Sequence, residues 1–309
     1  MTEPFVRPDV AAFLQYLNGQ TGPKMHEIPV SEARAMMMAM RHVADADVGE
    51  VALIRDIDIP GPAGTIKARL YDNRPNRAAG LVMVFYHGGG FVIGDIDSHE
   101  PYCAEAARQL DMPVISIDYR LAPEAPFPAA PEDCEAATRW IADNIPCTGL
   151  ILSGDSAGGN LTVVTAMALR DQPAAKPVVA QYPIYPAVAE HEPWPSYHAF
   201  KQGYLLTEDS MDFFMNSYAG DGSWRIAPLH HDLTNMPPAV VITAGLDPLR
   251  DQGRAYAARL IEAGVQTSYL EASGNIHGFI CLRKAIPSAH TDITNGINAL
   301  KALLAGIGQ

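Results

Sequence analysis

Short apolar runs alternate with segments of helical spacing over most of the chain, which predicts strands joined by crossover helices. The predicted strands are residues 50–59, 65–71, 81–86, 113–118, 150–153, 178–181, 239–244 and 267–271. The predicted helices between and after them are residues 101–110, 130–142, 157–170, 250–262 and 293–304. The first two strands flank a Gly-Pro-Ala-Gly turn, as an edge hairpin does. The pattern therefore favours an α/β fold with an eight-stranded, mostly parallel sheet flanked by helices.

Two segments fall outside this alternation. Residues 1–50 have helical spacing, and their second helix, with Ser31 as the expected N-cap, carries methionines at 36, 37, 38 and 40. A methionine-rich face is more often ordinary packing than pocket lining, and we expect packing here unless this helix lies over the active site, where the face would line an apolar pocket. Residues 186–228 hold several prolines and many aromatic residues, and this stretch is too long for a plain crossover. We expect both segments to form a helical cap over a catalytic core made of residues 51–185 and 229–309.

The composition of the chain limits the classes of partner that we expect it to bind. The 309 residues suit one α/β domain with an insertion, and the net charge is 22 − 35 = −13. Such a charge disfavours nucleic acid and anionic membranes as partners. The four cysteines lack zinc-ligand spacing, which favours reduced thiols, and no metal site is expected. With no secretory signal at Met1 and no apolar run long enough to span a bilayer, we expect a cytoplasmic protein without membrane contact.

A nucleophile motif follows the strand predicted at residues 150–153. Gly154-Asp155-Ser156-Ala157-Gly158 has the Gly-x-Ser-x-Gly pattern of a strand that turns sharply into a helix and exposes a serine. Because residues on either side of the serine come close across that turn, glycine suits positions 154 and 158. The motif alone is a weak signal, since glycine and serine are common in loops.

A glycine-rich loop supplies candidates for an oxyanion hole. His87-Gly88-Gly89-Gly90 follows the buried strand at residues 81–86. Backbone N–H groups of two of the three glycines, with the N–H of Ala157, could bind a developing oxyanion. A phosphate-binding loop is disfavoured, because Gly-x-Gly-x-x-Gly and a following Lys-Ser/Thr are both absent. We expect His87 to brace this loop by hydrogen bonds and not to act as a base.

An acid and a base follow in the order Ser…Asp…His. Asp247 comes after the strand at residues 239–244, and His277 comes after the last predicted strand. Ser156 would attack the acyl carbon, His277 would carry the proton, and Asp247 would hold the imidazole. Asp251, four residues after Asp247, is expected to be an exposed or capping residue. The stretch from Glu271 to Ile276 connects the last predicted strand to His277, and it predicts a long loop there.

Five ordered motifs resemble those of bacterial hormone-sensitive-lipase-like carboxylesterases, in their Gly-Asp-Ser-Ala-Gly subgroup. They are His87-Gly88-Gly89-Gly90-Phe91, Asp118-Tyr119-Arg120-Leu121-Ala122-Pro123-Glu124, Gly154-Asp155-Ser156-Ala157-Gly158-Gly159, Asp247-Pro248-Leu249-Arg250-Asp251 and His277-Gly278-Phe279. The resemblance covers about residues 50–305. It implies an α/β-hydrolase core with a helical cap and ester hydrolysis without a cofactor. It also implies a structural ion-pair network of Arg120 with Glu124 and Asp133.

The leading interpretation is a serine carboxylesterase for small, short- to medium-chain acyl esters. An amidase or lactonase could use the same triad, and a non-catalytic ligand receptor could use the same fold, though a receptor would be expected to lose a triad member. A lipase acting at oil–water interfaces fits the acidic surface less well. For oligomeric state only a base rate applies, which favours a homodimer.

Candidate pocket residues follow from their positions near the triad, and we expect fewer than half of them to touch substrate. They are Phe91, Ile93, Tyr185, Leu205, Phe213, Phe214, Phe279 and Ile280. Because an apolar pocket separates acyl chains by only about 1 kcal/mol per methylene, we expect a soft chain-length optimum.

Overall fold

An eight-stranded sheet forms the centre of the protein, in the order β1-β2-β4-β3-β5-β6-β7-β8. The computed structural model describes residues 3–189, 194–220 and 222–307. The strands are β1 (Leu53–Gly61), β2 (Gly64–Asp72), β3 (Gly80–Tyr86), β4 (Val114–Asp118), β5 (Cys147–Asp155), β6 (Val178–Ile184), β7 (Ala239–Leu246) and β8 (Thr267–Ile276). β2 pairs antiparallel with β1 and β4, and the remaining neighbours are parallel. The predicted fold class is confirmed.

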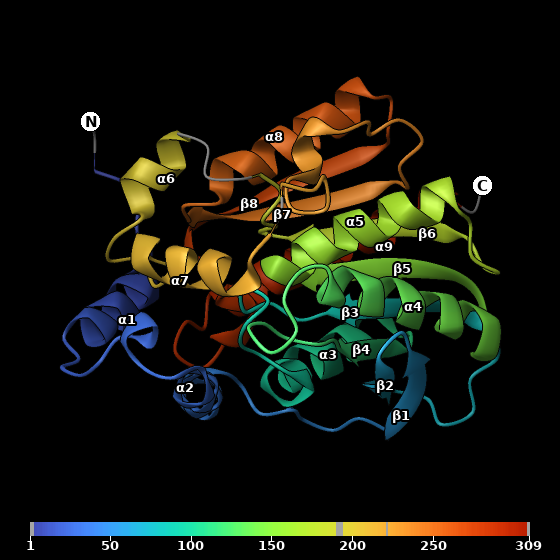
Figure 1. The fold of residues 1–309 in the computed structure, drawn as a ribbon, viewed down its shortest axis with the longest axis horizontal. Coiled ribbons are helices and arrows are strands. Elements are labelled where there is room, and N and C mark those ends of the chain that lie inside the picture. Colours follow the sequence, from blue (N-terminus) through green and yellow to red (C-terminus); the bar gives the residue numbers. More distant parts are fainter. Residues whose placement is uncertain (1–2, 190–193, 221, 308–309) are drawn as a thin grey trace.

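Helices cover both faces of this sheet (Figure 1). They are α3 (Ile96–Leu110), α4 (Ala129–Asn144), α5 (Ala157–Asp171), α8 (Arg250–Glu262) and α9 (Ala289–Ile307). Alternate residues of β3 enter two separate cores: Val82 and Val84 pack with α4, α5 and α8, whereas Met83 and Phe85 pack with α3 and α9. A strand buried on both faces has to be apolar at every position, which explains the continuous run at residues 81–86.

Two helix starts differ from the prediction. α3 begins at Ile96 and not near Pro101, because Asp95 and Ser98 form a capping box in which each side chain bonds the other's backbone. Pro101 lies inside the helix, where the sequence pattern suggested a start. The second N-terminal helix begins one residue before Ser31, after Pro29, and has no side-chain cap.

The last strand is longer than predicted. β8 continues to Ile276 beside β7, with a register irregularity between Ala244 and Leu246. Gly274 has a φ of 74°, a left-handed conformation that glycine adopts without strain, so the chain bends there without leaving the sheet. The extra residues before His277 thus form an irregularity within β8 and not a separate loop, and His277 directly follows the Ile276–Leu246 pair.

Four helices, α1 (Pro8–Asn18), α2 (Val30–Ala44), α6 (Pro195–Phe200) and α7 (Glu208–Tyr218), gather on one side of the molecule beside the strands (Figure 1). They come from the two segments that interrupt the alternating pattern. The short 3-10 turn η1 (Met25–Glu27), between α1 and α2, contacts α7. Among the described residues, no helix has both the length and the apolar character that crossing a bilayer requires.

A buried ion pair fastens α2 to the core. Arg283 donates through Nε to Asp45 Oδ1 at 2.9 Å, and the side chains are only 3% and 0% exposed. The carbonyl of Ala44 also accepts the N–H groups of Lys284 and Ala285. The end of α2 is thus held against the segment that follows His277.

We expect Arg283→Met to lower the free energy of unfolding by about 3–5 kcal/mol, because it leaves the Asp45 carboxylate buried without its partner. Urea unfolding followed by circular dichroism measures the change. Lys67→Met is the control, since the Lys67–Asp58 pair is 61% and 66% exposed and its loss should cost about 1 kcal/mol or less. Equal losses in both variants would contradict this assignment.

Candidate active site

Ser156 occupies a strained turn between β5 and α5. Its φ of 56° and ψ of −116° are unfavourable for a residue with a side chain. The Ser156 N–H donates to the carbonyl of Ile184 at 2.9 Å, which holds the turn against β6. A Cβ atom on Gly158 would overlap the carbonyl oxygen of Tyr86, so only glycine allows α5 to start this close to β3.

Three side chains form a continuous hydrogen-bonded line from the core to the serine. His277 Nδ1 lies 2.7 Å from Asp247 Oδ2, and His277 Nε2 lies 2.9 Å from Ser156 Oγ. Asp247 is fully buried, and its other oxygen accepts the N–H of Leu249 at 2.8 Å. This arrangement orients the imidazole and lets it accept a proton from the serine hydroxyl.

One glycine of the loop contacts the strained turn that carries Ser156, called the elbow below. Two other glycines of the loop line the cavity. Gly88 donates its N–H to Asp155 Oδ1 at 2.7 Å, so this group is already used inside the protein. The prediction that Gly88 is an oxyanion donor is therefore wrong. Gly89, Gly90 and Ala157 line the cavity next to Ser156 and remain the candidate donors.

The buried Asp155 carboxylate contacts several segments of the site, a role that the sequence pattern did not predict. Besides Gly88, its carboxylate contacts His99 Nε2 at 3.3 Å and accepts the Tyr185 hydroxyl at 3.3 Å. Burial alone would raise the pKa of Asp155, but the His99 charge and the hydrogen bonds lower it on balance. Burial opposes protonation of His99, yet neighbouring Cys281 and Asp155 raise its pKa well above the usual range. His99 and Asp155 thus form a buried pair beneath the elbow, with each group raising or lowering the pKa of the other toward the charged form.

His99 was missed because no motif marks it. The Asp95–Ser98 capping box, which is readable from sequence, would have placed His99 in the first turn of α3. That turn follows the glycine loop and points toward the elbow. The capping box at the start of the helix, and not the histidine itself, was therefore the sequence feature that could have identified His99.

His87 braces the glycine loop as expected. Its Nδ1 donates to the Gly88 carbonyl at 2.8 Å, and its ring stacks on Tyr119 with centroids 4.3 Å apart. Burial, together with the charge of His99, lowers the pKa of His87 to about 4. The imidazole is therefore neutral and lies away from the proton path.

A cavity of about 260 Å³ opens over Ser156 and is lined by core and cap residues. Of the predicted pocket residues, Phe91, Ile93, Leu205 and Phe214 line it. Tyr185, Phe213, Phe279 and Ile280 do not, and these predictions are wrong. Phe213 and Phe214 are neighbours on α7 and so face different directions, whereas Met211, Phe214 and Met215 share one face. Tyr185, Phe279 and Ile280 are buried beneath the site.

Methionines make up much of the cap side of the cavity. The six that line it are Met25, Met36, Met37, Met40, Met211 and Met215. Because α2 lies over the active site, its methionine face lines the cavity, which is the alternative that the sequence left open. Unbranched thioether side chains adapt their shape, so this wall can accommodate varied apolar groups.

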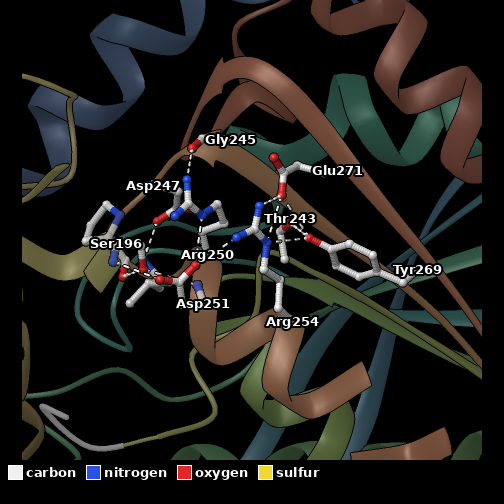
Figure 2. A network of polar contacts seen from close by, with 11 residues as sticks. Ser196, Thr243, Gly245, Asp247, Arg250, Asp251, Arg254, Tyr269 and Glu271 are labelled. Atoms are coloured by element: carbon white, nitrogen blue, oxygen red, sulfur yellow. Dashed lines mark hydrogen bonds and ion pairs between the residues drawn. The ribbon is translucent and has the colours of Figure 1, made fainter. Parts of the chain in front are cut away.

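A polar network joins the loop after β7 to the cap (Figure 2). Asp251 Oδ2 accepts the N–H of Ser196 at 2.9 Å, and Ser196 Oγ donates to the Pro248 carbonyl at 2.9 Å. Arg250 donates to the Gly245 carbonyl at 3.0 Å, and Arg254 joins α8 to Glu271 of β8. Asp251 therefore caps the first turn of α6 and holds it beside the Asp247 loop.

The ion-pair network implied by the resemblance is confirmed only in part. Arg120 pairs with Asp133 at 2.8 Å and lies 3.8 Å from Glu132. Glu124 instead accepts from Arg34 of α2 at 2.7 Å. The two carboxylates serve different contacts: Asp133 stays inside the core, while Glu124 ties the cap to it.

Replacing Asp155 by Asn should slow phosphorylation of Ser156 by diethyl 4-nitrophenyl phosphate roughly 10- to 100-fold, because the oxyanion loop loses its charged anchor. Intact-protein mass spectrometry measures the labelling rate. Asp133→Asn removes a comparably buried carboxylate away from the cavity and should label at the wild-type rate. Equal slowing in the two variants, or an adduct outside Ser156, would refute this role of Asp155.

Comparisons with known proteins show which family the sequence matches and that its relatives include esterases. The profile of the alpha/beta hydrolase fold family matches residues 83–281. Among curated relatives, Esterase LipI of Mycobacterium tuberculosis is 35% identical over 285 residues, which cover 88% of this chain and 89% of the relative. The ethyl acetate hydrolase of Pseudomonas putida is 32% identical over 315 residues, covering 96% and 98%.

Solved structures give the same result. The ester hydrolase EH1AB1 from the metagenome of Lake Arreo superposes with a TM-score of 0.90 at 38% identity and covers 98% of this chain and 100% of its own. A thermostable esterase of Pseudomonas putida superposes with a TM-score of 0.92 at 27% identity, covering 98% and 99%. The chain therefore belongs to the α/β-hydrolase-fold family, among its esterases, as its resemblance to hormone-sensitive-lipase-like carboxylesterases predicts.

Proposed function

We propose that this protein is a serine carboxylesterase that hydrolyses short- to medium-chain acyl esters through an acyl-enzyme intermediate. The observation that carries this proposal is the unbroken line of hydrogen bonds from Asp247 through His277 to Ser156, at the floor of an apolar cavity. The relatives of this chain include esterases, and ester hydrolysis is a reaction that this hydrogen-bonded line of side chains can carry out.

In the first half-reaction, Ser156 Oγ attacks the ester carbonyl carbon while His277 Nε2 takes the hydroxyl proton. The N–H of Ala157 and those of Gly89 and Gly90 stabilise the resulting oxyanion. His277 then gives the proton to the leaving alkoxide, which departs as the alcohol. A water molecule then attacks the acyl carbon while His277 takes its proton; the bond to Ser156 Oγ breaks, His277 returns the proton to that oxygen, and the carboxylic acid is released. Asp247 stabilises the imidazolium in both halves.

In this proposal, residues 1–50 and 186–228 act as a cap that selects the substrate. α2 and α7 contribute most of the methionines over Ser156, and the ring of Phe214 lies against Gly90. Because the methionine wall is apolar and adaptable, it favours acyl chains with apolar stretches of varied shape over peptide-like amides.

Three further expectations stay predictions. The proposed steps use only side chains and water, so we expect no cofactor. The described cysteines are all free, which supports a cytoplasmic location. A homodimer remains the base-rate expectation.

Wild-type protein should hydrolyse 4-nitrophenyl esters from acetate to octanoate with a gradual optimum, and palmitate poorly. Ser156→Ala should lose at least about 1,000-fold in kcat, since the nucleophile is gone. Initial rates of nitrophenolate release measure both. Undiminished turnover by the variant would eliminate the mechanism, and no turnover by wild type would favour a ligand receptor.

Phe214→Ala should move the chain-length optimum toward longer acyl groups, because it removes a ring that lies over Gly90 in the cavity. We expect kcat/KM for decanoate relative to butyrate to rise roughly 10-fold, as an apolar pocket gains a few methylene contacts. Phe213→Ala is the matched control on the same helix, outside the cavity lining, and should leave this ratio unchanged. An equal response of the two variants would show that Phe214 does not limit chain length.

A further inference from the structure

Arg41, on the last turn of α2, brings a positive charge to the cavity. Among the described residues that line the cavity, it is the only arginine, and no lysine accompanies it. Its neighbours in the lining on the same helix are Met37 and Met40. A guanidinium among methionines is unusual, because burying charge in an apolar wall is costly unless a partner compensates it.

The protein satisfies this guanidinium only in part. Arg41 Nη1 donates to His42 Nδ1 at 3.0 Å. A ring nitrogen that accepts this bond brings no negative charge to the guanidinium. Nη2 lies 3.9 Å from Glu100 Oε2, beyond hydrogen-bond distance. Nε is buried and has no hydrogen-bond partner. An arginine carries five N–H donors in a planar fork, so its two Nη groups have donors beyond the one bonded to His42.

Neighbouring carboxylates are committed elsewhere. Glu100 lies 3.3 Å from Arg69, which it shares with Asp56 and Asp97. Asp155 is the one carboxylate among the described lining residues, and it already binds Gly88, His99 and Tyr185. No acidic side chain of the described cavity wall is therefore left to neutralise Arg41 fully.

We propose that Arg41 binds a carboxylate on the substrate, remote from the ester that Ser156 attacks. This inference rests on the proposed esterase function and names a substrate class for it. The preferred esters would carry an apolar spacer, packed against Met37 and Met40, and end in a carboxylate held by the guanidinium. Half-esters of dicarboxylic acids and esters of hydroxy acids have this form. A planar guanidinium matches a carboxylate through two parallel hydrogen bonds.

The test compares charged and neutral probes of matched length. 4-Nitrophenyl half-esters of the dicarboxylic acids from succinate to suberate place the carboxylate on the acyl side. Acetate esters of ω-hydroxy acids place it on the alcohol side. The methyl esters of the same compounds are the neutral partners. The measured quantity is the ratio of kcat/KM for each charged probe to that for its neutral partner.

In Arg41→Met this ratio should fall roughly 10- to 100-fold for at least one probe series, the range expected when a hydrogen bond to a charged group is lost. Because the ratio is taken within each matched pair, a change that Arg41→Met makes to charged and neutral probes alike cancels. Arg41→Lys should retain part of the preference. Arg55 is at an exposed position of β1, outside the cavity lining, and Arg55→Met changes the net charge by the same amount. This variant should leave the charged-to-neutral ratio unchanged.

Glu100→Gln provides a change in the opposite direction. Removing the negative charge near Arg41 should raise the charged-to-neutral ratio several-fold, an effect that a merely structural role would not produce. The proposal is overturned if Arg41→Met leaves the ratio unchanged in both series, or if Arg55→Met lowers it equally. Neutral esters hydrolysed by wild type but not by Ser156→Ala would leave the esterase function standing in either case. Failure of wild type on every ester would refute the esterase function itself.

Discussion

The carboxylate of Asp155 holds the active site together. It bonds the Gly88 N–H of the loop after β3, the His99 ring at the start of α3 and the Tyr185 hydroxyl after β6. One buried charge thus fastens three segments, distant in sequence, to the strained turn that carries Ser156. A strained backbone persists only where its surroundings determine it, and these contacts supply that determination. The oxyanion loop and the nucleophile consequently keep a common geometry without substrate.

The cap is attached to this core at separate points with different chemistry. The buried Arg283–Asp45 pair holds the end of α2 next to the segment after His277. The reciprocal bonds of Ser196 and Asp251 hold α6 beside the Asp247 loop. Both attachments lie close to triad residues, so the wall that selects a substrate is positioned relative to the groups that act on it. Adaptable methionines between these points allow varied shapes, while the backbone that carries them stays in place.

Most errors of prediction share one physical cause, which is that sequence spacing does not say which partner a side chain or a backbone group meets in the folded protein. Phe213 and Phe214 are chemically identical, yet only the second reaches the cavity, because one residue along a helix rotates the side chain by about 100°. Gly88 was grouped with its neighbouring glycines, but its N–H points to Asp155. The Ser273-Gly274-Asn275 stretch suggested a loop, although pairs with β7 on both sides of it, at Ala272 and Ile276, make it an irregularity within the strand.

The amino-acid sequence by itself determined the fold class, the order of strands and crossover helices, and the identity of the serine, aspartate and histidine. These follow from local periodicity and from residue types whose order along the chain is typical of a hydrolytic triad. Tertiary structure alone decided the environment of those groups. It placed His99 against Asp155, turned the α2 methionines from packing into cavity wall, and left Arg41 beside them with unused donors. Contacts between segments far apart in the chain create these features, and no local pattern encodes them.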